Sequence, residues 1–245
     1  MCIRDRFDAF SFLISALSLG LIQTQERPLS REQSTDEETA SGVIHEIGEG
    51  LRLVIGNQIL RALLGSAATV SLSGGMIGTL YALYLVQELG LPPWLLGLVI
   101  GVGGVSALVG AFVVTRVTQR FGIGPTLIGA RLVASAMSAF MVLAWGPLRV
   151  VLPLLILSQA ADAVWSIYAI NEVSLQQAIT PHHLLGRVHA SVRFLTGILF
   201  PVGALLGGLL GQTIGLRGAI SVGLLIGASS ALWLFFSPLR NREKI

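Results

Sequence analysis

Long apolar runs separated by short polar segments dominate this chain. Seven runs stand out, at residues 7–22, 62–86, 93–115, 125–145, 148–170, 192–212 and 217–237. An α-helix of about 20 apolar residues spans a hydrocarbon core of roughly 30 Å, and these runs are far longer than the strands of a membrane barrel. The pattern therefore predicts an all-α polytopic membrane protein with about seven transmembrane helices.

Two stretches interrupt this pattern after the first run. The polar segment "QTQERPLSREQSTDEETASG" (23–42) has no aromatic residue and predicts a flexible linker. Residues 43–64 mix charged and bulky apolar side chains at helical spacing, which is typical of an amphipathic surface helix. We expect a start and first helix, a linker with an amphipathic helix, a six-helix bundle and a tail, at 1–22, 23–61, 62–237 and 238–245.

The composition supports a membrane protein and excludes several other classes. Hydrophobic residues make up 53% of the chain and charged residues only 12%, whereas soluble domains carry about a quarter charged residues. The net charge of +3 reflects arginines in the connecting segments, so it does not indicate nucleic-acid binding. The single cysteine, Cys2, excludes an internal disulfide framework and is poorly placed for a metal site.

The arginines and lysines suggest an orientation in a cell membrane. With the C-terminus in the cytoplasm, eleven of them lie on the inner side and four on the outer side. The start "MCIRDR" does not fit, because seven spans would place it outside. A signal peptide is one explanation, but no small-x-small cleavage site precedes "QTQER". We prefer a chain whose true beginning is missing and whose first six residues are foreign or misassigned.

Glycine recurs at every fourth position of "PVGALLGGLLGQTIG" (201–215), at Gly203, Gly207, Gly211 and Gly215. Glycine weakens a helix by roughly 0.5–1 kcal/mol relative to alanine, so the repeat needs an offsetting gain. In lipid, small residues along one helix face let a neighbouring backbone approach closely. We therefore expect this stripe to pack against another helix.

Polar side chains within the apolar runs are the candidates for function. Asp162 lies near the middle of its run, and ionisable groups at that depth are usually functional. We expect it to bind a cation or proton, with a structural hydrogen bond as the alternative. The other candidates for a substrate or proton pathway share its helix or line the run 62–86, and they are Ser158, Gln159, Trp165, Ser166, Ser73 and Tyr81.

Other polar residues have simpler explanations. Arg131 lies close enough to the end of its run to extend towards the interface, and solvation at the surface equally explains Asn171 and Glu172. "HEIGE" (45–49) lacks the second histidine of a zinc-protease helix. No nucleophile–base pair is visible, so we expect no enzyme activity.

Three stretches make the chain resemble the C-terminal half of a major facilitator superfamily transporter, preceded by the last helix of the N-terminal half. They are "FDAFSFLISALSL" (7–19), "EIGEGLRLVIGNQILRALL" (46–64) and "TPHHLLGRVHASVRFLTGILFPVGALLGGLLGQTIGLRGAI" (180–220). The last is similar to an efflux branch that includes enterobactin exporters and macrolide efflux pumps.

The resemblance implies that the six later runs are helices seven to twelve of that fold. It places Ser73, Tyr81 and Asp162 beside the substrate route, and the glycine stripe where the two halves meet. It also identifies the cytoplasmic gating loop between helices eight and nine with Arg116, Arg120 and Gly122. Gln119 stands where an Asp is usual, so gating by a charge pair is doubtful.

These observations predict a secondary active transporter, expected to export a small amphipathic molecule such as a drug or siderophore. The proton gradient is its expected energy source, and we expect no bound cofactor. Its expected partners are the bilayer, a small-molecule substrate, and either a missing six-helix N-terminal half or a second copy of the chain. A half-size dimerising transporter and a non-transporting membrane scaffold remain the alternatives.

Overall fold

The computed structural model describes residues 2–21 and 41–241, and every regular element in this part of the chain is helical. Two compact units divide the chain at Gly42. The first contains α1 (Cys2–Gly20), and the second contains the helices from Val43 onwards. The linker predicted at 23–42 falls almost entirely outside the described residues.

Five helical stretches are long and apolar enough to cross a membrane. They are α3 (Gln58–Leu83) with its π-helical end η1 (Tyr84–Glu88), α4 (Pro93–Phe121), α5 (Ile123–Leu143), α6 (Leu148–Gln159) continued by α7 (Ala161–Ile179), and α8 (Leu185–Phe235). The short elements are α2 (Ser41–Gly56), η2 (His182–Leu184) and η3 (Pro238–Asn241). The fold is therefore that of an all-α polytopic membrane protein, as the sequence predicts.

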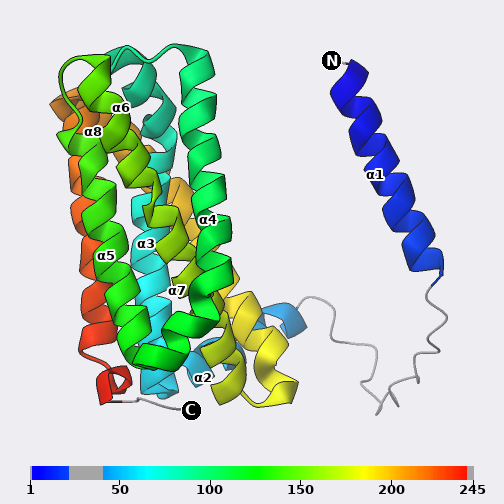
Figure 1. The fold of residues 1–245 in the computed structure, drawn as a ribbon. Coiled ribbons are helices and arrows are strands. Elements are labelled where there is room, and N and C mark those ends of the chain that lie inside the picture. The colour runs from blue at the N-terminus through cyan, green and yellow to red at the C-terminus, as the bar shows by residue number, and fades with distance from the viewer. Residues whose placement is uncertain (1, 22–40, 242–245) are drawn as a thin grey trace. The chain divides into compact units, whose positions relative to one another are not determined.

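The 51-residue helix α8 consists of two arms. Gly215 has φ 80° and ψ 163°, which breaks the helix into arms at 185–214 and 216–235. Figure 1 shows the chain rising through the first arm and returning through the second. The bundle thus contains six membrane-crossing segments from α3 to the end of α8.

Two glycines make equivalent turns at opposite ends of the bundle. Gly122 joins α4 to α5 with φ 81° and ψ 165°, nearly the same conformation as Gly215. Only glycine adopts such angles without strain. The Gly122 end also carries α2 and the C-terminal η3, and the Gly215 end carries η1 and the α5–α6 connection (Figure 1).

The interior of the bundle has an apolar layer near each end. One cluster, near Gly215, includes Tyr84, Leu85, Val99 and Leu155. The other, near Gly122, includes Leu63, Leu127, Tyr168 and Leu175, as well as Leu239 from η3. The residues between the clusters along α3, α5, α6–α7 and the second arm of α8 line two cavities, so the polar positions lie in a middle layer.

The amphipathic helix α2 ends earlier than the predicted stretch 43–64. Asn57 interrupts the helix, and its side-chain oxygen accepts hydrogen bonds from the backbone N–H groups of Ile59 and Leu60, which caps α3. Val54 is fully buried against an apolar cluster that includes Val188 at the start of α8. Packing on α8 therefore holds α2 at the Gly122 end.

Candidate functional site

The candidate site forms where the fourth membrane-crossing segment is interrupted between α6 and α7. Ala160 separates the two helices, and Asp162 lies in the first turn of α7, near the middle of the 32-residue segment. The backbone N–H of Ala163 donates to the Ser106 hydroxyl of α4, at 3.1 Å. A helix N-terminus favours a negative side chain, so the break provides a suitable place for the Asp162 carboxylate.

A glycine of α4 makes room for the polar groups of this segment. A Cβ built on the buried Gly103 would collide with the Asp162 carboxylate and with the Gln159 amide. Gly110, two turns further along, faces the backbone of Ala163 in the same way. Close contact between α4 and α7 thus brings Asp162 and Gln159 against the α4 backbone.

Gln159 connects three of the helices. The Tyr81 hydroxyl donates to Gln159 Oε1 at 3.2 Å, and Gln159 Nε2 donates to the Val99 carbonyl at 3.2 Å. Tyr81 belongs to α3 and Val99 to α4. The side chain of Gln159 therefore uses both ends of its amide, which fixes the tyrosine beside the carboxylate segment.

Two adjacent cavities lie in this polar layer. The first, of about 140 Å³, is lined by Tyr81, Ser158, Gln159 and Asp162, among others. The second, of about 220 Å³, is lined by Ser73, Trp165, Arg131 and several serines. Both cavities are lined by Ile77, Ser138 and Leu224, so the cavities meet at these three residues.

The structure brings together most of the pathway residues that the sequence singles out. Six of them line one cavity or the other, namely Ser73, Tyr81, Ser158, Gln159, Asp162 and Trp165. Ser158 is buried, and its hydroxyl donates to the Leu155 carbonyl. Ser166 is not among the residues that line either cavity.

Sequence reasoning missed Arg131. Its side chain is only 3% exposed and does not extend to the surface. The guanidinium carbon lies 3.5 Å from the ring centroid of Tyr168 and 4.7 Å from that of Trp165. An arginine about one and a half turns inside an apolar run resembles an interfacial residue. The pair of aromatic residues three positions apart on α7, Trp165 and Tyr168, is the signal that could have shown its burial.

The explanation by surface solvation is also wrong for Asn171. It is 4% exposed, its amide donates to the Ile167 carbonyl at 2.8 Å, and the Thr118 hydroxyl of α4 lies 2.9 Å from its Oδ1. Glu172 is half-buried, and its charge interacts with that of Arg131. These polar groups therefore belong to the interior of the bundle.

The expected gating residues surround the α4–α5 turn. Arg116 and Arg120 are exposed, and Gly122 forms the turn itself. The Arg120 guanidinium lies 5.7 Å from the Phe121 ring centroid. Neither arginine forms an ion pair with any residue that the structure describes.

The glycine stripe packs inside the bundle, against α3. A Cβ on Gly203 would strike the Leu72 carbonyl, one on Gly207 would lie 2.8 Å from Met76 Cα, and one on Gly211 would reach the Leu80 side chain. A Cβ on Gly215 would meet no atom within 4 Å, and this glycine instead forms the turn between the two arms of α8. The resemblance implies that the glycine stripe lies where the two halves of a transporter meet. The structure differs, because α3 of the same bundle packs against the stripe.

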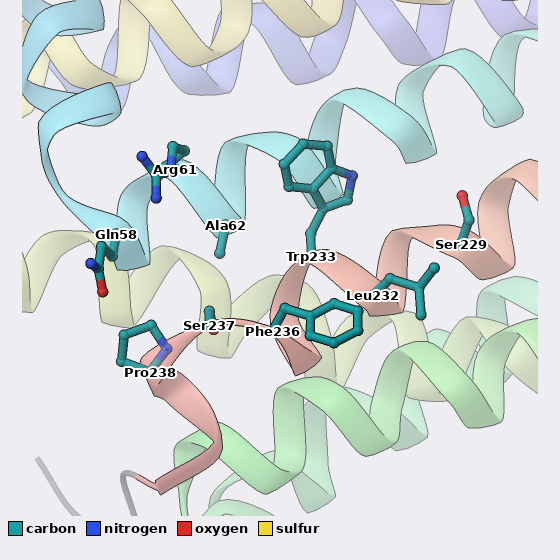
Figure 2. A pocket seen from close by; sticks show the side chains of 9 residues that line it. All are labelled: Gln58, Arg61, Ala62, Ser229, Leu232, Trp233, Phe236, Ser237 and Pro238. Atoms are coloured by element: carbon teal, nitrogen blue, oxygen red, sulfur yellow. The ribbon is translucent and has the colours of Figure 1, made fainter.

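A wider cavity, of about 560 Å³, lies elsewhere and contains none of the predicted site residues. It is formed at the Gly122 end between the start of α3 and the end of α8. Figure 2 shows Gln58 and Arg61 on one side and Trp233 and Phe236 on the other. Its size alone does not make it the site, because the charged residues in the middle layer of the bundle, Arg131 and Asp162, line the other two cavities.

Comparison with known proteins identifies the family. The family model described as "Major Facilitator Superfamily" matches residues 7–188, about three quarters of the chain. Neither the curated proteins nor the solved structures gave a match. Within the part of the chain that the structure describes, no three metal-ligating side chains gather as a metal site would require. The helical bundle, its polar middle layer and the match together show that the chain belongs to the major facilitator superfamily of secondary transporters.

Proposed function

We propose that this chain forms one bundle of a proton-coupled exporter of small amphipathic molecules, resembling the drug and siderophore efflux branch. The observation that carries the proposal is the Asp162 carboxylate, which lies beside a cavity in the middle of a broken membrane-crossing segment. Ionisable groups at this depth mark ion and substrate pathways. Broken helices near the midplane are a common feature of transporter binding sites.

Each lining residue has a role in this proposal. Asp162 takes up and releases the proton, and Gln159 holds Tyr81 beside it through the hydrogen bond between them. Trp165, Ser73 and the apolar lining residue Ile77 contact the transported molecule. An apolar surface with a few polar groups suits an amphipathic ligand.

A second bundle completes the transporter in this proposal. Alternating access requires two bundles that rock around one site, and this chain supplies one bundle of six crossings. The second is either an N-terminal half or another copy of the chain. Crosslinking in native membranes distinguishes them, because a covalent dimer of this chain appears only in the second case. We further propose a cell-membrane location with the C-terminus in the cytoplasm.

Replacement of Asp162 by Asn tests the proposed coupling. The complete transporter is reconstituted in proteoliposomes, and efflux of a panel of amphipathic dyes is measured with and without an imposed pH gradient. We expect Asp162→Asn to abolish the acceleration by the gradient while exchange down a dye gradient continues. Ser174→Ala is the matched control on the same helix, because the exposed Ser174 hydroxyl donates to the Ile170 carbonyl and lines neither cavity. Unchanged acceleration in Asp162→Asn removes this carboxylate from the mechanism.

A further inference from the structure

Arg131 is a buried charge whose surroundings compensate it incompletely. The rings of Tyr168 and Trp165 cover its guanidinium, and such cation–π contacts stabilise a desolvated cation. Its Nε nevertheless has no hydrogen-bond partner among the described residues, and the side chain forms no ion pair with any of them. A buried arginine is disfavoured unless hydrogen bonds and an opposite charge compensate it, and here Tyr168 and the charge of Glu172 provide part of that compensation.

The residues that line the adjoining cavity include one charged side chain, that of Arg131. Arg131 is the only ionisable residue among the twelve that line the cavity of about 220 Å³. Glu172 interacts with it electrostatically from the next turn of α7 but does not line this cavity. Asp162 lines the neighbouring cavity, beyond the shared residues Ile77, Ser138 and Leu224. The residues of α3 and α8 that line the cavity of about 220 Å³ are uncharged.

The cavity also offers hydroxyl donors. Ser230 is completely buried, and its hydroxyl has no partner among the described residues. Ser138 likewise has no hydrogen bond within the described chain. By contrast, the hydroxyls of Ser73 and Ser135 already donate to the carbonyls of Gly223 and Arg131. A guanidinium and free hydroxyls around one space form a donor set for an oxyanion.

We propose that this cavity is a subsite for a carboxylate group of the transported molecule, held by Arg131, Ser230 and Ser138, with Trp165 beside its apolar body. The inference rests on the proposed function for the identity of the ligand, but binding can be measured without transport. A planar fork of guanidinium donors suits a carboxylate in particular. The Asp162 carboxylate lines the neighbouring cavity. The two cavities together then favour molecules that carry both an acidic and a basic group.

Benzoate and benzamide are the probes that test the subsite. They have nearly the same shape, but only benzoate is charged. The full chain in detergent micelles carries Trp94→Phe, Trp145→Phe and Trp233→Phe, so that Trp165 alone reports on the cavity. We expect benzoate to change the Trp165 emission saturably and to bind roughly tenfold or more tightly than benzamide, as hydrogen bonds to charged groups imply.

Variants of the donors assign the effect to this cavity. Arg131→Gln is expected to remove the preference for benzoate, and Arg131→Lys to retain part of it. Ser230→Ala should weaken benzoate binding severalfold. Ser229→Ala is the matched control, because its exposed hydroxyl donates to the Ile226 carbonyl and lines the cavity at the Gly122 end instead. Should Arg131→Gln fail to fold, Arg131→Lys and Ser230→Ala still decide the outcome.

Several results would overturn the subsite. Equal affinities for benzoate and benzamide would contradict it, and so would benzoate binding that Ser230→Ala and both Arg131 variants leave unchanged. Chloride that competes with benzoate at equal concentration would show a site for any small anion and not for a carboxylate. Failure of pH-driven transport leaves these binding results intact, so the two proposals can fail separately.

Discussion

Arg217 connects three segments at the Gly215 end of the bundle. Its Nε donates to the Tyr84 hydroxyl at 3.2 Å, and its Nη2 donates to the Ala144 carbonyl at 2.6 Å. The guanidinium also lies 4.8 Å from the Trp145 ring centroid. Tyr84, which is fully buried, donates in turn to the Met141 carbonyl. One side chain thus joins the end of α3, the α5–α6 connection and the second arm of α8.

Replacement of Arg217 by Ala should destabilise this end of the bundle. Hydrogen bonds to charged groups contribute about 1.5–3 kcal/mol each, and partial exposure to solvent lowers that value. We expect a loss of about 2 kcal/mol in the free energy of unfolding, measured by denaturation in mixed micelles. Arg149→Ala, an exposed arginine at the same end, is the control. An equal effect of both variants would contradict the role of the Arg217 contacts.

At the scale of single residues, the sequence was informative where a charge stands in the middle of an apolar run. Asp162 stands out as a candidate for that reason. Arg131 does not, because its distance from the end of a run allows either burial or extension to the interface. Only the packing of α5 against α7, which places the Tyr168 and Trp165 rings over the guanidinium, decides between them.

At the scale of elements, glycines set the distances between helices in a repeated arrangement. Gly110 lies twelve positions before the turn glycine Gly122, and Gly203 lies twelve positions before Gly215. Both face a backbone carbonyl of a crossing helix, that of Ala163 on α7 and that of Leu72 on α3. The two turns lie at opposite ends of the bundle (Figure 1). This correspondence is typical of the inverted three-helix repeats of the superfamily.

Gly203→Ala tests the close approach of α3 and α8. The added methyl group would collide with the backbone of Leu72, which cannot move aside as a flexible side chain can. We expect a loss of about 1–3 kcal/mol in stability, typical of overpacking, measured by denaturation in mixed micelles.

Gly208→Ala provides the matched control on the same helix. A Cβ there meets no atom within 4 Å, so the higher helix propensity of alanine should leave stability unchanged or raise it by up to about 1 kcal/mol. If Gly203→Ala and Gly208→Ala had the same free energy of unfolding, the glycine stripe would not determine the spacing of α3 and α8.

Gly122→Ala tests the one-residue turn between α4 and α5. Its φ of 81° is unfavourable for any residue with a side chain, so we expect destabilisation of about 1–2 kcal/mol and a lower thermal midpoint in micelles. Gly129→Ala on α5, where a Cβ meets nothing within 4 Å, should not lower it. Equal midpoints for the two variants would show that the turn relaxes without strain.

The positions of the membrane-crossing helices follow closely from the apolar pattern. The run predicted at 93–115 corresponds to α4, Pro93–Phe121, and the run at 125–145 to α5, Ile123–Leu143. The partner of the glycine stripe could not be predicted, since spacing by four defines a face but not which helix covers it. Gly215 shares the spacing, yet its backbone conformation makes it a turn.

At the scale of the whole molecule, the bundle is apolar outside and polar in its middle layer. Large side chains such as Phe112, Leu205 and Leu225 are 70% or more exposed, at 79%, 70% and 72%. Lipid or a second bundle accounts for such surfaces. The interior cavities, by contrast, contain Arg131, Asp162 and several hydroxyls. Unlike a soluble protein, the bundle thus presents large apolar side chains on its outer surface and keeps charged and hydroxyl groups in an inner layer.

Thiol labelling in proteoliposomes tests this arrangement of apolar and polar surfaces. In a chain carrying Cys2→Ser, single cysteines are introduced as Ser138→Cys, where the two cavities meet, and as Leu225→Cys, on the outer surface of α8. Reaction with a charged, membrane-impermeant methanethiosulfonate reagent requires water. We predict that Ser138→Cys reacts and Leu225→Cys does not. Rapid labelling of Leu225→Cys together with an inert Ser138→Cys would contradict both the lipid exposure of the outer surface and the aqueous pathway inside.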